Sequence, residues 1–578
     1  MQEHCTVHYA NGALCSVDDF APRQRRMTPG AELHLQPGGG RSSSLVLPFL
    51  NLDLGDRGMV LGVGWTGEWA VQFNRGQDGK LRLQAGMAHT HLTLHPGETI
   101  RTPSILLLFW RDDRLRGHNM LRRFILKHHR PRPGGEPLIA PLCNGNWGGT
   151  PAEVHLDNVA NIIEHELPFE YYWIDAEWFG GEGHWMEHAG NWTPREDLYP
   201  EGFTPISDRL HASGRKLLLW FEPERVAPGT PWAKTHEDWL LRVPDDKAVC
   251  WADYGEHLGT ADWVRMESKR NQLGKGDRLL NLGNPDARRF LTDFLSDAID
   301  RFGLDCLRQD SNIAQLEYWR HNDEPDRQGM TEIRYVEGQY ALWDELLARH
   351  PGLIIDNCAS GGRRIDLESI SRSTPLWRTD YSVGHQDPAA IQCHTHGLLL
   401  WVPLNGTGGG YLKDWSRYEL RSTMSAALTV GLWGFGDAPQ EELPQEYPFV
   451  HAKELLEEYL SVRQYYYGDY YPLTEYSLAQ DAWMAYQLDR PEEGDGLVVV
   501  LKRRQSPFTS ADLPLRGLRA QASYEVTNID TGERCVVPGA ELMQAGLNVR
   551  LAGRPDSALL RYQALPEDAA DDRSDRQD

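Results

Sequence analysis

The sequence DCLRQDSN, residues 305–312, carries a short strand that we expect to end in a charged pair, Arg308 and Asp310. It follows a segment with helical signals, in which Asn284 can cap the helix and Gly303 can stop it. Apolar residues recur there at helical spacing: Phe290, Leu291, Phe294, Leu295, Ala298, Ile299 and Phe302. In a βα-barrel, catalytic residues lie at the carboxyl end of a strand that follows a helix, and this stretch has that order of helix, strand and charged residues. Alone, the stretch also fits a solvated loop with an ion pair.

The same arrangement recurs along the chain, which favours the barrel interpretation. Eight strands are predicted, each separated from the next by enough chain for a helical crossover, at residues 138–144, 171–175, 216–224, 305–310, 353–358, 375–380, 398–404 and 428–435. Strands alternating with helices form a parallel sheet, and eight of them favour closure into a (β/α)8 barrel, or TIM barrel. We therefore predict an α/β fold with this barrel at its centre.

Antiparallel β-structure is predicted on both sides of the barrel. Residues 1–130 contain short β-prone runs broken by turn residues and end in a linker helix, which predicts a shortened N-terminal β-sandwich. The proline- and glycine-rich stretch RPRPGGEP, residues 130–137, separates it from a catalytic barrel predicted over 137–445. A C-terminal β-sandwich is predicted over 470–565 and a disordered acidic tail over 566–578.

Composition excludes several classes of protein. The chain has 578 residues and a net charge of −24, which argues against a nucleic-acid backbone as partner. No apolar run approaches the roughly 20 residues that span a bilayer, and the first residues lack the pattern of a signal peptide. The eight cysteines are far apart and form no CxxC pair, which is typical of free thiols in a reducing compartment. We expect a cytoplasmic protein without a membrane partner.

The predicted strand ends carry a ring of acidic residues. They bring Asp175 with Glu177, Glu222 with Glu224, Asp310 with Arg308, and Asp380 close behind Trp377. Of the 20 tryptophans, 16 lie between Trp147 and Trp433, and such enrichment suits stacking on the apolar faces of sugar rings. Paired carboxyls without a metal-ligand pattern indicate acid–base or nucleophilic chemistry on a carbohydrate.

Two other functions compete with glycoside cleavage. The sequence CHTHG contains Cys393, His394 and His396, which resemble metal ligands, but it falls late in the barrel and within a predicted helix. A carbohydrate-binding protein without catalytic activity is the other alternative. The full set of acids at the strand ends argues against it.

Five motifs, in order and spacing, resemble glycoside hydrolase family 36, the melibiase-like α-galactosidases and α-N-acetylgalactosaminidases. They are YYWIDAEWFGG, KLLLWFEPERV, CLRQDSN, IIDNCASGGRRIDLESI and PLWRTDYS. The resemblance covers nearly the whole chain. It implies a retaining, exo-acting, double-displacement glycosidase that uses no cofactor and no metal.

The resemblance also implies roles for individual residues. Asp310 matches the family's nucleophile on the fourth strand, and Asp380 matches its acid/base on the sixth. Arg308 should keep Asp310 ionised for attack, and apolar neighbours could raise the pKa of Asp380 for proton delivery. The residues expected to bind substrate are Asp175, Glu177, Trp178, Trp220, Arg308, Asn312, Cys358, Gly361 and Trp377. For Glu222 and Glu224, an ion-pair role beneath the site competes with substrate contact.

Several positions depart from the family pattern. Ala176 stands where the family has a second aspartate, and Arg308 stands where it has lysine. Gln309 replaces a tryptophan, and Ser311 replaces methionine or phenylalanine. These changes surround the sugar pocket and spare both catalytic acids, so we expect intact machinery with a shifted sugar preference.

The expected substrate is an oligosaccharide or glycoconjugate with a terminal α-linked galactose-type sugar. An α-galactoside is the first choice. An α-linked N-acetylgalactosamine or galactosamine is the alternative within the family. The chain is also a candidate homo-oligomer.

Overall fold

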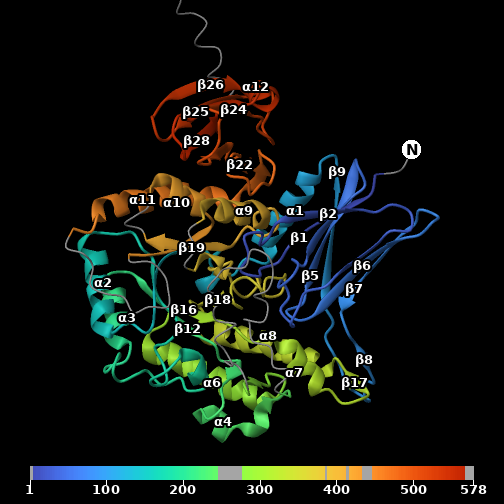
Figure 1. Ribbon diagram of the computed structural model, residues 1–578, viewed down its shortest axis with the longest axis vertical. Coiled ribbons are helices and arrows are strands. Elements are labelled where there is room, and N and C mark those ends of the chain that lie inside the picture. The colour runs from blue at the N-terminus through green and yellow to red at the C-terminus, as the bar shows by residue number, and fades with distance from the viewer. Residues whose placement is uncertain (1–3, 245–275, 384–386, 412–415, 433–445, 567–578) are drawn as a thin grey trace, which may run out of the picture.

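A computed structural model describes residues 4–244, 276–383, 387–411, 416–432 and 446–566 (Figure 1). It has N-terminal antiparallel sheets beside a central barrel and a C-terminal antiparallel sheet above the barrel. The predicted fold class is therefore confirmed. The predicted domain boundaries remain predictions, and most of the predicted acidic tail lies outside the described residues.

The N-terminal part consists of two antiparallel sheets and one helix. The larger sheet has the order β2-β1-β4-β5-β9, with bounds Pro22–Arg26, Thr6–Ala10, Phe49–Asp53, Arg57–Gly64 and Ser104–Arg111. The smaller has the order β3-β6-β7, with bounds Glu32–Leu35, Trp69–Arg75 and Leu81–Met87. Trp65 and Trp69 are fully buried here, so they belong to the core. Helix α1, Arg114–His128, begins with its Asp113 cap and leads to the barrel.

The barrel strands are parallel and follow one another in chain order around the sheet. They are β10 Leu142–Asn146, β11 Tyr171–Ile174, β12 Lys216–Phe221, β16 Cys306–Gln309, β18 Ile354–Asn357, β19 Gly406–Tyr411 and β20 Ala427–Gly431. The sheet order β18-β16-β12-β11-β10-β20-β19 pairs the last strand, β20, with the first, β10. Five of the eight predicted strands are thus found, and β11, β12, β16 and β18 each end beside the acidic or cysteine residue expected there. The predicted strand 428–435 overlaps β20, and its residues 433–435 lie outside the described residues.

Residues 374–378 close the barrel at its sixth position without forming a regular strand. The Thr374 amide donates to the Ile355 carbonyl at 3.0 Å, and Asn357 donates back to Thr374 at 3.2 Å. On the other side, Gly406 donates to the Pro375 carbonyl at 2.7 Å, and Arg378 donates to Gly406 at 3.1 Å. The strand predicted over 375–380 is therefore replaced by a short bridge, because Pro375 cannot donate to the ladder.

The strand predicted over 398–404 is wrong. Its apolar residues end helix α9, Pro388–Leu398, and form the turn after it. The true seventh strand is the glycine-rich β19. A Cβ on Gly408 would lie 1.5 Å from the Trp377 ring, so glycine is required where the bulky Trp377 packs against this strand.

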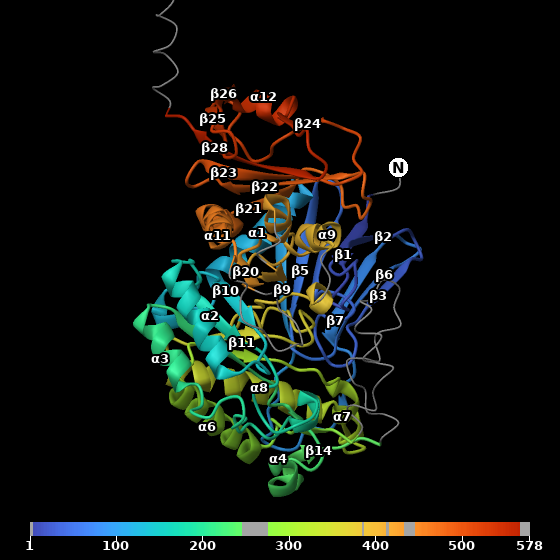
Figure 2. The same cartoon turned by 60° about the vertical axis from the view of Figure 1, so that its left-hand side comes forward.

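Helices cover the outside of the barrel, as α2, α3 and α6 do in Figure 2. The remaining bounds are α2 Ala152–Glu164, α3 Thr204–Ala212, α4 Pro231–Thr235, α6 Pro285–Phe302, α7 Gln315–His321, α8 Met330–Arg349, α10 Arg417–Thr423 and α11 Phe449–Val462. Helix α6 begins at the Asn284 cap and ends at the left-handed Gly303, as predicted. No helix in the described ranges is long and apolar enough to cross a bilayer.

The C-terminal sheet has the order β21-β22-β23-β28-β25-β26. Its strands are Asp469–Pro472, Trp483–Arg490, Asp495–Lys502, Asp556–Ala564, Ser523–Asn528 and Arg534–Pro538. The pair β24 Ser510–Leu513 and β27 Leu547–Arg550 packs with helix α12 Gly539–Gln544 around a separate small core. The main hydrophobic core, by contrast, is continuous from the N-terminal sheets through the barrel.

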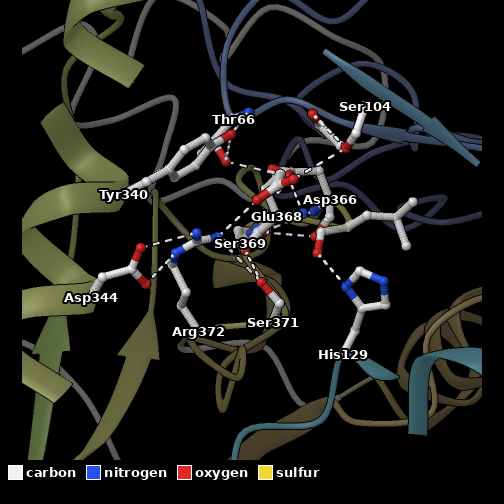
Figure 3. Close-up of polar contacts among 12 residues, drawn as sticks. Thr66, Ser104, His129, Tyr340, Asp344, Asp366, Glu368, Ser369, Ser371 and Arg372 are labelled. Carbon is white, nitrogen blue, oxygen red and sulfur yellow. Dashed lines mark hydrogen bonds and ion pairs between the residues drawn. The ribbon is translucent and has the colours of Figure 1, made fainter. Parts of the chain in front are cut away.

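Residues 366–372 join the N-terminal sheet to the barrel through a polar network (Figure 3). Asp366 is fully buried and accepts hydrogen bonds from Ser42 Oγ at 2.7 Å and Thr66 Oγ1 at 3.2 Å. Arg372 pairs with Glu368 at 2.8 Å and with Asp344 of α8 at 2.7 Å. The site loops that precede this segment are thereby fixed to both parts of the molecule.

Asp366→Ala should lower the free energy of unfolding by about 2–4 kcal/mol, because it leaves two buried hydroxyl groups without an acceptor. Urea unfolding at pH 7 measures the change. Asp344→Ala, at an exposed ion pair of the same junction, is the control and should cost less than about 1 kcal/mol. Equal losses for both variants would contradict this account of the junction.

Candidate active site

The candidate site lies at the carboxyl ends of the barrel strands. The residues that directly follow these ends are Asp175 after β11, Glu222 after β12, Asp310 after β16, Cys358 after β18 and, two residues after the bridging segment, Asp380. The structure therefore gathers the sequence-predicted acids at one end of the barrel, where a (β/α)8 fold carries its active site.

Asp310 accepts hydrogen bonds at both of its carboxylate oxygens. Its Oδ1 accepts from the backbone amides of Ser311 at 2.7 Å and Ser360 at 3.1 Å. Its Oδ2 accepts from Trp220 Nε1 at 3.1 Å and from Asn312 Nδ2 at 3.0 Å. All these groups are donors, so the site is built around a carboxylate and fixes its orientation.

The electrostatics also favour the ionised form of Asp310. Burial by itself would raise the pKa of this carboxyl. The positive charge of Arg308 and hydrogen bonds from Ser360, Cys358 and Ser311 outweigh it, so the pKa lies below its ordinary value. Asp310 can therefore act as an anionic nucleophile near neutral pH.

Asp380 lies in the opposite electrostatic setting. It begins a short 3-10 turn, Asp380–Ser382, and keeps part of its surface exposed. Loss of hydration and the negative charge of Asp310 raise the pKa of Asp380 to about 7, against the charge of Arg363. Gly361 has a φ of 82°, and a Cβ there would lie 2.8 Å from the Asp380 amide. Glycine thus permits the close approach of the two loops.

Arg308 connects three strand ends through one guanidinium group. Its Nη1 pairs with Asp356 at 2.5 Å, its Nη2 donates to Cys358 Sγ at 3.0 Å, and its Nε lies 3.4 Å from Asp175 Oδ2. The guanidinium also lies over the Trp173 ring, 4.3 Å from its centroid. The planar fork reaches all these groups at once, which an ammonium group could not do.

Asp175, Ala176 and Glu177 follow β11 and make different contacts. Asp175 accepts from Trp173 Nε1 at 2.8 Å, and burial raises its pKa to about 6 despite Arg308. Ala176 is buried and offers no polar group. Glu177 has a φ of 77°, accepts from Trp147 Nε1 at 2.7 Å and lies 3.8 Å from Arg195. These contacts hold Glu177 in place in the loop that follows β11.

The three predicted tryptophans occupy different places. Trp220 contacts Asp310 directly through its indole nitrogen. Trp377 is buried against the glycine-rich β19. Trp178 is fully buried, donates to the Trp220 carbonyl at 2.9 Å and packs on Phe203 and Phe302. Trp178 therefore supports the site from behind, because its ring faces the helices outside the barrel.

Glu222 and Glu224 are fully buried in ion pairs beneath the site. Glu222 pairs with Arg225 at 2.6 Å and accepts from the Asn312 amide at 2.6 Å. Glu224 pairs with Arg364 at 2.7 Å and accepts from Gln309 Nε2 at 2.8 Å. These contacts fit the ion-pair alternative. They hold the chain on either side of Asp310 in place.

Gln309 points away from the barrel interior. Its amide donates to Glu224, and its oxygen accepts from Trp343 Nε1 of α8 at 2.7 Å. Gln309 stands where the resembled family has a tryptophan, so this replacement changes the contacts between strand β16 and helix α8. Ser311 directly follows Asp310, and its Oγ accepts a hydrogen bond from Gln315 Nε2 at 2.7 Å.

Sequence reasoning missed the contribution of the N-terminal part. Arg41 is fully buried and donates to the Ser311 carbonyl at 3.4 Å. Asp19 accepts from Thr379 Oγ1 at 2.6 Å, directly beside Asp380, and burial raises the pKa of Asp19 to about 7. Arg363 donates to Cys15 Sγ at 3.2 Å. Of these residues, only Arg363 lies in a motif that the sequence analysis identified, SGGRR.

The CHTHG residues lie on helix α9, as predicted, but their side chains diverge. Cys393 donates to the Ser477 carbonyl at 3.0 Å, whereas His394 Nε2 lies 2.9 Å from the Ser16 carbonyl. His396 packs edge-on against Tyr476. Across the described ranges, no three such side chains are grouped to hold a metal ion.

Comparison with known families gives two matches. The melibiase family model matches residues 112–251 and 254–404. The model of the glycosyl hydrolase family 36 C-terminal domain matches residues 480–561.

Curated relatives are α-galactosidases of greater length. The chain is 24% identical to α-galactosidase Mel36A of Lactobacillus acidophilus over 88% of this chain and 66% of the relative. It is also 24% identical to α-galactosidase AgaA of Geobacillus stearothermophilus over 84% of this chain and 63% of that relative. The chain thus spans about two thirds of the length of these proteins.

Solved structures share the fold. The crystal structure of AgaA from Geobacillus stearothermophilus matches with a TM-score of 0.76 at 20% identity, covering 98% of this chain and 75% of that one. The galactosidase domain of the α-galactosidase–sucrose kinase AgaSK matches with a TM-score of 0.78 at 18% identity, covering 98% and 74%. Variants of AgaA have been solved with stachyose and with raffinose.

Arg308→Lys should destabilise the chain by about 1–3 kcal/mol, because a lysine cannot satisfy Asp356, Cys358 and Asp175 together. Urea unfolding at pH 7 tests this. Arg209→Lys, on the exposed face of α3, is the matched control and should change stability by less than about 0.5 kcal/mol. Unaltered stability of Arg308→Lys would mean that the guanidinium fork does not organise the strand ends.

Proposed function

Because this chain belongs to the melibiase family, we propose that it is a retaining, exo-acting α-glycoside hydrolase, and specifically an α-galactosidase. The observation that carries the proposal is the pair of acids with opposed electrostatics, Asp310 ionised and Asp380 with a pKa raised to about 7. Two carboxyls whose environments push their pKa values apart are suited to separate nucleophilic and acid/base roles.

The mechanism we propose is a double displacement. Asp310 attacks the anomeric carbon while Asp380 protonates the departing glycosidic oxygen, and a glycosyl–enzyme ester forms. Asp380, now ionised, then takes a proton from water, which attacks the anomeric carbon and releases Asp310. The Trp220 and Asn312 donors orient the nucleophile, and the amide of Ser360 stabilises its charge.

The proposed substrate is an oligosaccharide or glycoconjugate with a terminal α-linked galactose. The relatives are named α-galactosidases, and a relative's structures hold raffinose and stachyose. The proposed sugar contacts are Asp175, Glu177, Trp220, Arg308, Asn312, Cys358, Gly361 and Trp377, with Trp178 behind them. The cytoplasmic location and the homo-oligomer remain predictions.

Activity should depend on pH with an alkaline limit set by Asp380. The acid must be protonated, so kcat/KM should fall as pH rises through about 7, whereas Asp310 keeps the reaction active well into the acid range. Hydrolysis of 4-nitrophenyl α-galactoside from pH 4 to 9 measures this.

Asp380→Asn should lose the alkaline limit and slow raffinose cleavage by about 10²–10⁴-fold, with a smaller loss on the activated aryl substrate. Equal losses on both substrates would contradict the acid/base role.

Asp310→Gly should abolish turnover and regain cleavage of an activated aryl α-galactoside when azide is added as a substitute nucleophile. The matched control is Asp208→Ala, an exposed acid of α3, which should retain full activity. Full activity of Asp310→Gly would contradict the nucleophile assignment.

A panel of aryl α-glycosides of galactose, N-acetylgalactosamine, galactosamine, glucose and arabinopyranose identifies the sugar. The galactoside should be cleaved fastest, with no loss of rate in a chelator. Preference for either amino sugar would correct the substrate, saturable binding without turnover would indicate a binding protein, and inactivation by the chelator would indicate a metal enzyme.

A further inference from the structure

Ser360, in the turn that follows β18, has a backbone conformation that serine rarely adopts. Its φ is 51°, in the left-handed region, and it precedes Gly361 with a φ of 82°. The residue is buried, with 1% of its surface exposed. Glycine adopts this conformation without strain, so a serine at this position indicates that its hydroxyl group has a role that outweighs the strain.

The hydroxyl group of Ser360 connects Arg41 of the N-terminal part to Asn312. Its oxygen lies 3.4 Å from Nη1 of Arg41 and 2.8 Å from Oδ1 of Asn312. A guanidinium group has only N–H donors, so the hydroxyl oxygen accepts from Arg41. The hydroxyl proton is therefore free to be donated to Asn312, whose carbonyl oxygen accepts it.

The side chain of Asn312 continues this direction to the nucleophile. Because its Oδ1 accepts from Ser360, its Nδ2 faces Asp310 and donates to Oδ2 at 3.0 Å. An ionised carboxylate only accepts hydrogen bonds, so the amide cannot turn over without losing both contacts. The backbone amide of Asn312 is fixed separately by Glu222, at 2.6 Å. The hydroxyl of Ser360 thus determines which end of the Asn312 amide faces Asp310.

Ser360 acts on both oxygens of Asp310 by these two routes. Its backbone amide donates to Oδ1 at 3.1 Å, and its hydroxyl group acts on Oδ2 through Asn312. Trp220 and the amide of Ser311 add one further donor to Oδ2 and Oδ1 respectively. A carboxylate held at both oxygens cannot rotate without breaking hydrogen bonds, so its orientation depends on the full set.

We propose that Ser360 is a positioning residue for the nucleophile: its hydroxyl group fixes the Asn312 amide, and this amide fixes Asp310. The inference rests on the proposed function, because it takes Asp310 as the nucleophile. Attack on the anomeric carbon requires one oxygen of Asp310 to be held in line with the reacting bond. Hydrogen bonds that run in one direction also polarise one another, so the series from Arg41 to Asp310 stabilises the carboxylate charge.

Two variants at Ser360 separate positioning from a structural role. Ser360→Ala removes the hydroxyl group and keeps the strained backbone, whereas Ser360→Gly removes both the hydroxyl group and the strain. Each should lower kcat for 4-nitrophenyl α-galactoside at least about tenfold and leave KM within about twofold, because the loss is one of orientation in the transition state. Urea unfolding should show Ser360→Gly to be at least as stable as Ser360→Ala. Activity that does not follow stability identifies positioning.

Glu166→Gly is the matched control for the backbone change. Glu166 has the same φ of 51°, but its side chain is 79% exposed and pairs with Lys453. This variant should keep kcat within about twofold of the unaltered chain.

A double-mutant cycle tests whether Ser360 acts through Asn312. Asn312→Ala removes the amide that carries the effect of the hydroxyl group to Asp310. In that background, Ser360→Ala should cause no further loss of kcat, because the two residues belong to one series of hydrogen bonds. A crystal structure of Ser360→Ala should show the Asn312 amide turned over or displaced, with its Nδ2 beyond hydrogen-bond distance of Asp310.

Four results would overturn the proposal. The first is a kcat of Ser360→Ala within about twofold of the unaltered chain, and the second is a rise in KM with kcat unchanged, which would indicate substrate binding instead. The third is an equal loss from Ser360→Ala with and without Asn312, and the fourth is an unmoved Asn312 amide. Because the crystal structure requires no turnover, an unmoved amide is distinguishable from failure of the proposed hydrolysis, in which the unaltered chain itself cleaves no glycoside.

Discussion

The buried guanidinium of Arg308 is the interaction on which the arrangement of the strand ends depends. A cation removed from water costs much free energy unless anions and hydrogen-bond acceptors surround it. Here Asp356 lies in β18 and Cys358 directly follows it, Asp175 directly follows β11, and Arg308 itself belongs to β16. Satisfying this one group therefore fixes the relative positions of three strand ends.

The same charge separates the two acids that the proposed reaction needs. Arg308 lowers the pKa of Asp310 together with the backbone amides, and Asp310, once ionised, raises the pKa of Asp380. The raised pKa of Asp380 is thus in part a consequence of the lowered pKa of Asp310. One electrostatic arrangement prepares an anion and a proton donor at the same end of the barrel.

The N-terminal sheets complete this site. Arg41 contacts the loop after Asp310, and Asp19 holds Thr379 beside Asp380. The buried network around Asp366 joins the same sheets to helix α8 and to the loop that carries Gly361 (Figure 3). The continuous core between the sheets and the barrel agrees with this view. The first 130 residues are therefore a structural part of the candidate active site.

The sequence by itself determined the alternation of strands and helices, the barrel and the ring of acids, because hydrophobic period and capping are local properties. The helix Pro285–Phe302 and the strand before Asp310 follow directly from them. Tertiary structure decided what depends on neighbours distant in the chain. The Trp377 ring packs where side chains on the glycines of β19 would stand, so this glycine-rich segment is the seventh strand and the apolar run 398–404 is not. Pro375 cannot donate to the ladder, so a short bridge replaces the strand predicted over 375–380. The contacts of Asp19 and Arg41 join residues more than 250 positions apart, and no local pattern encodes such pairs.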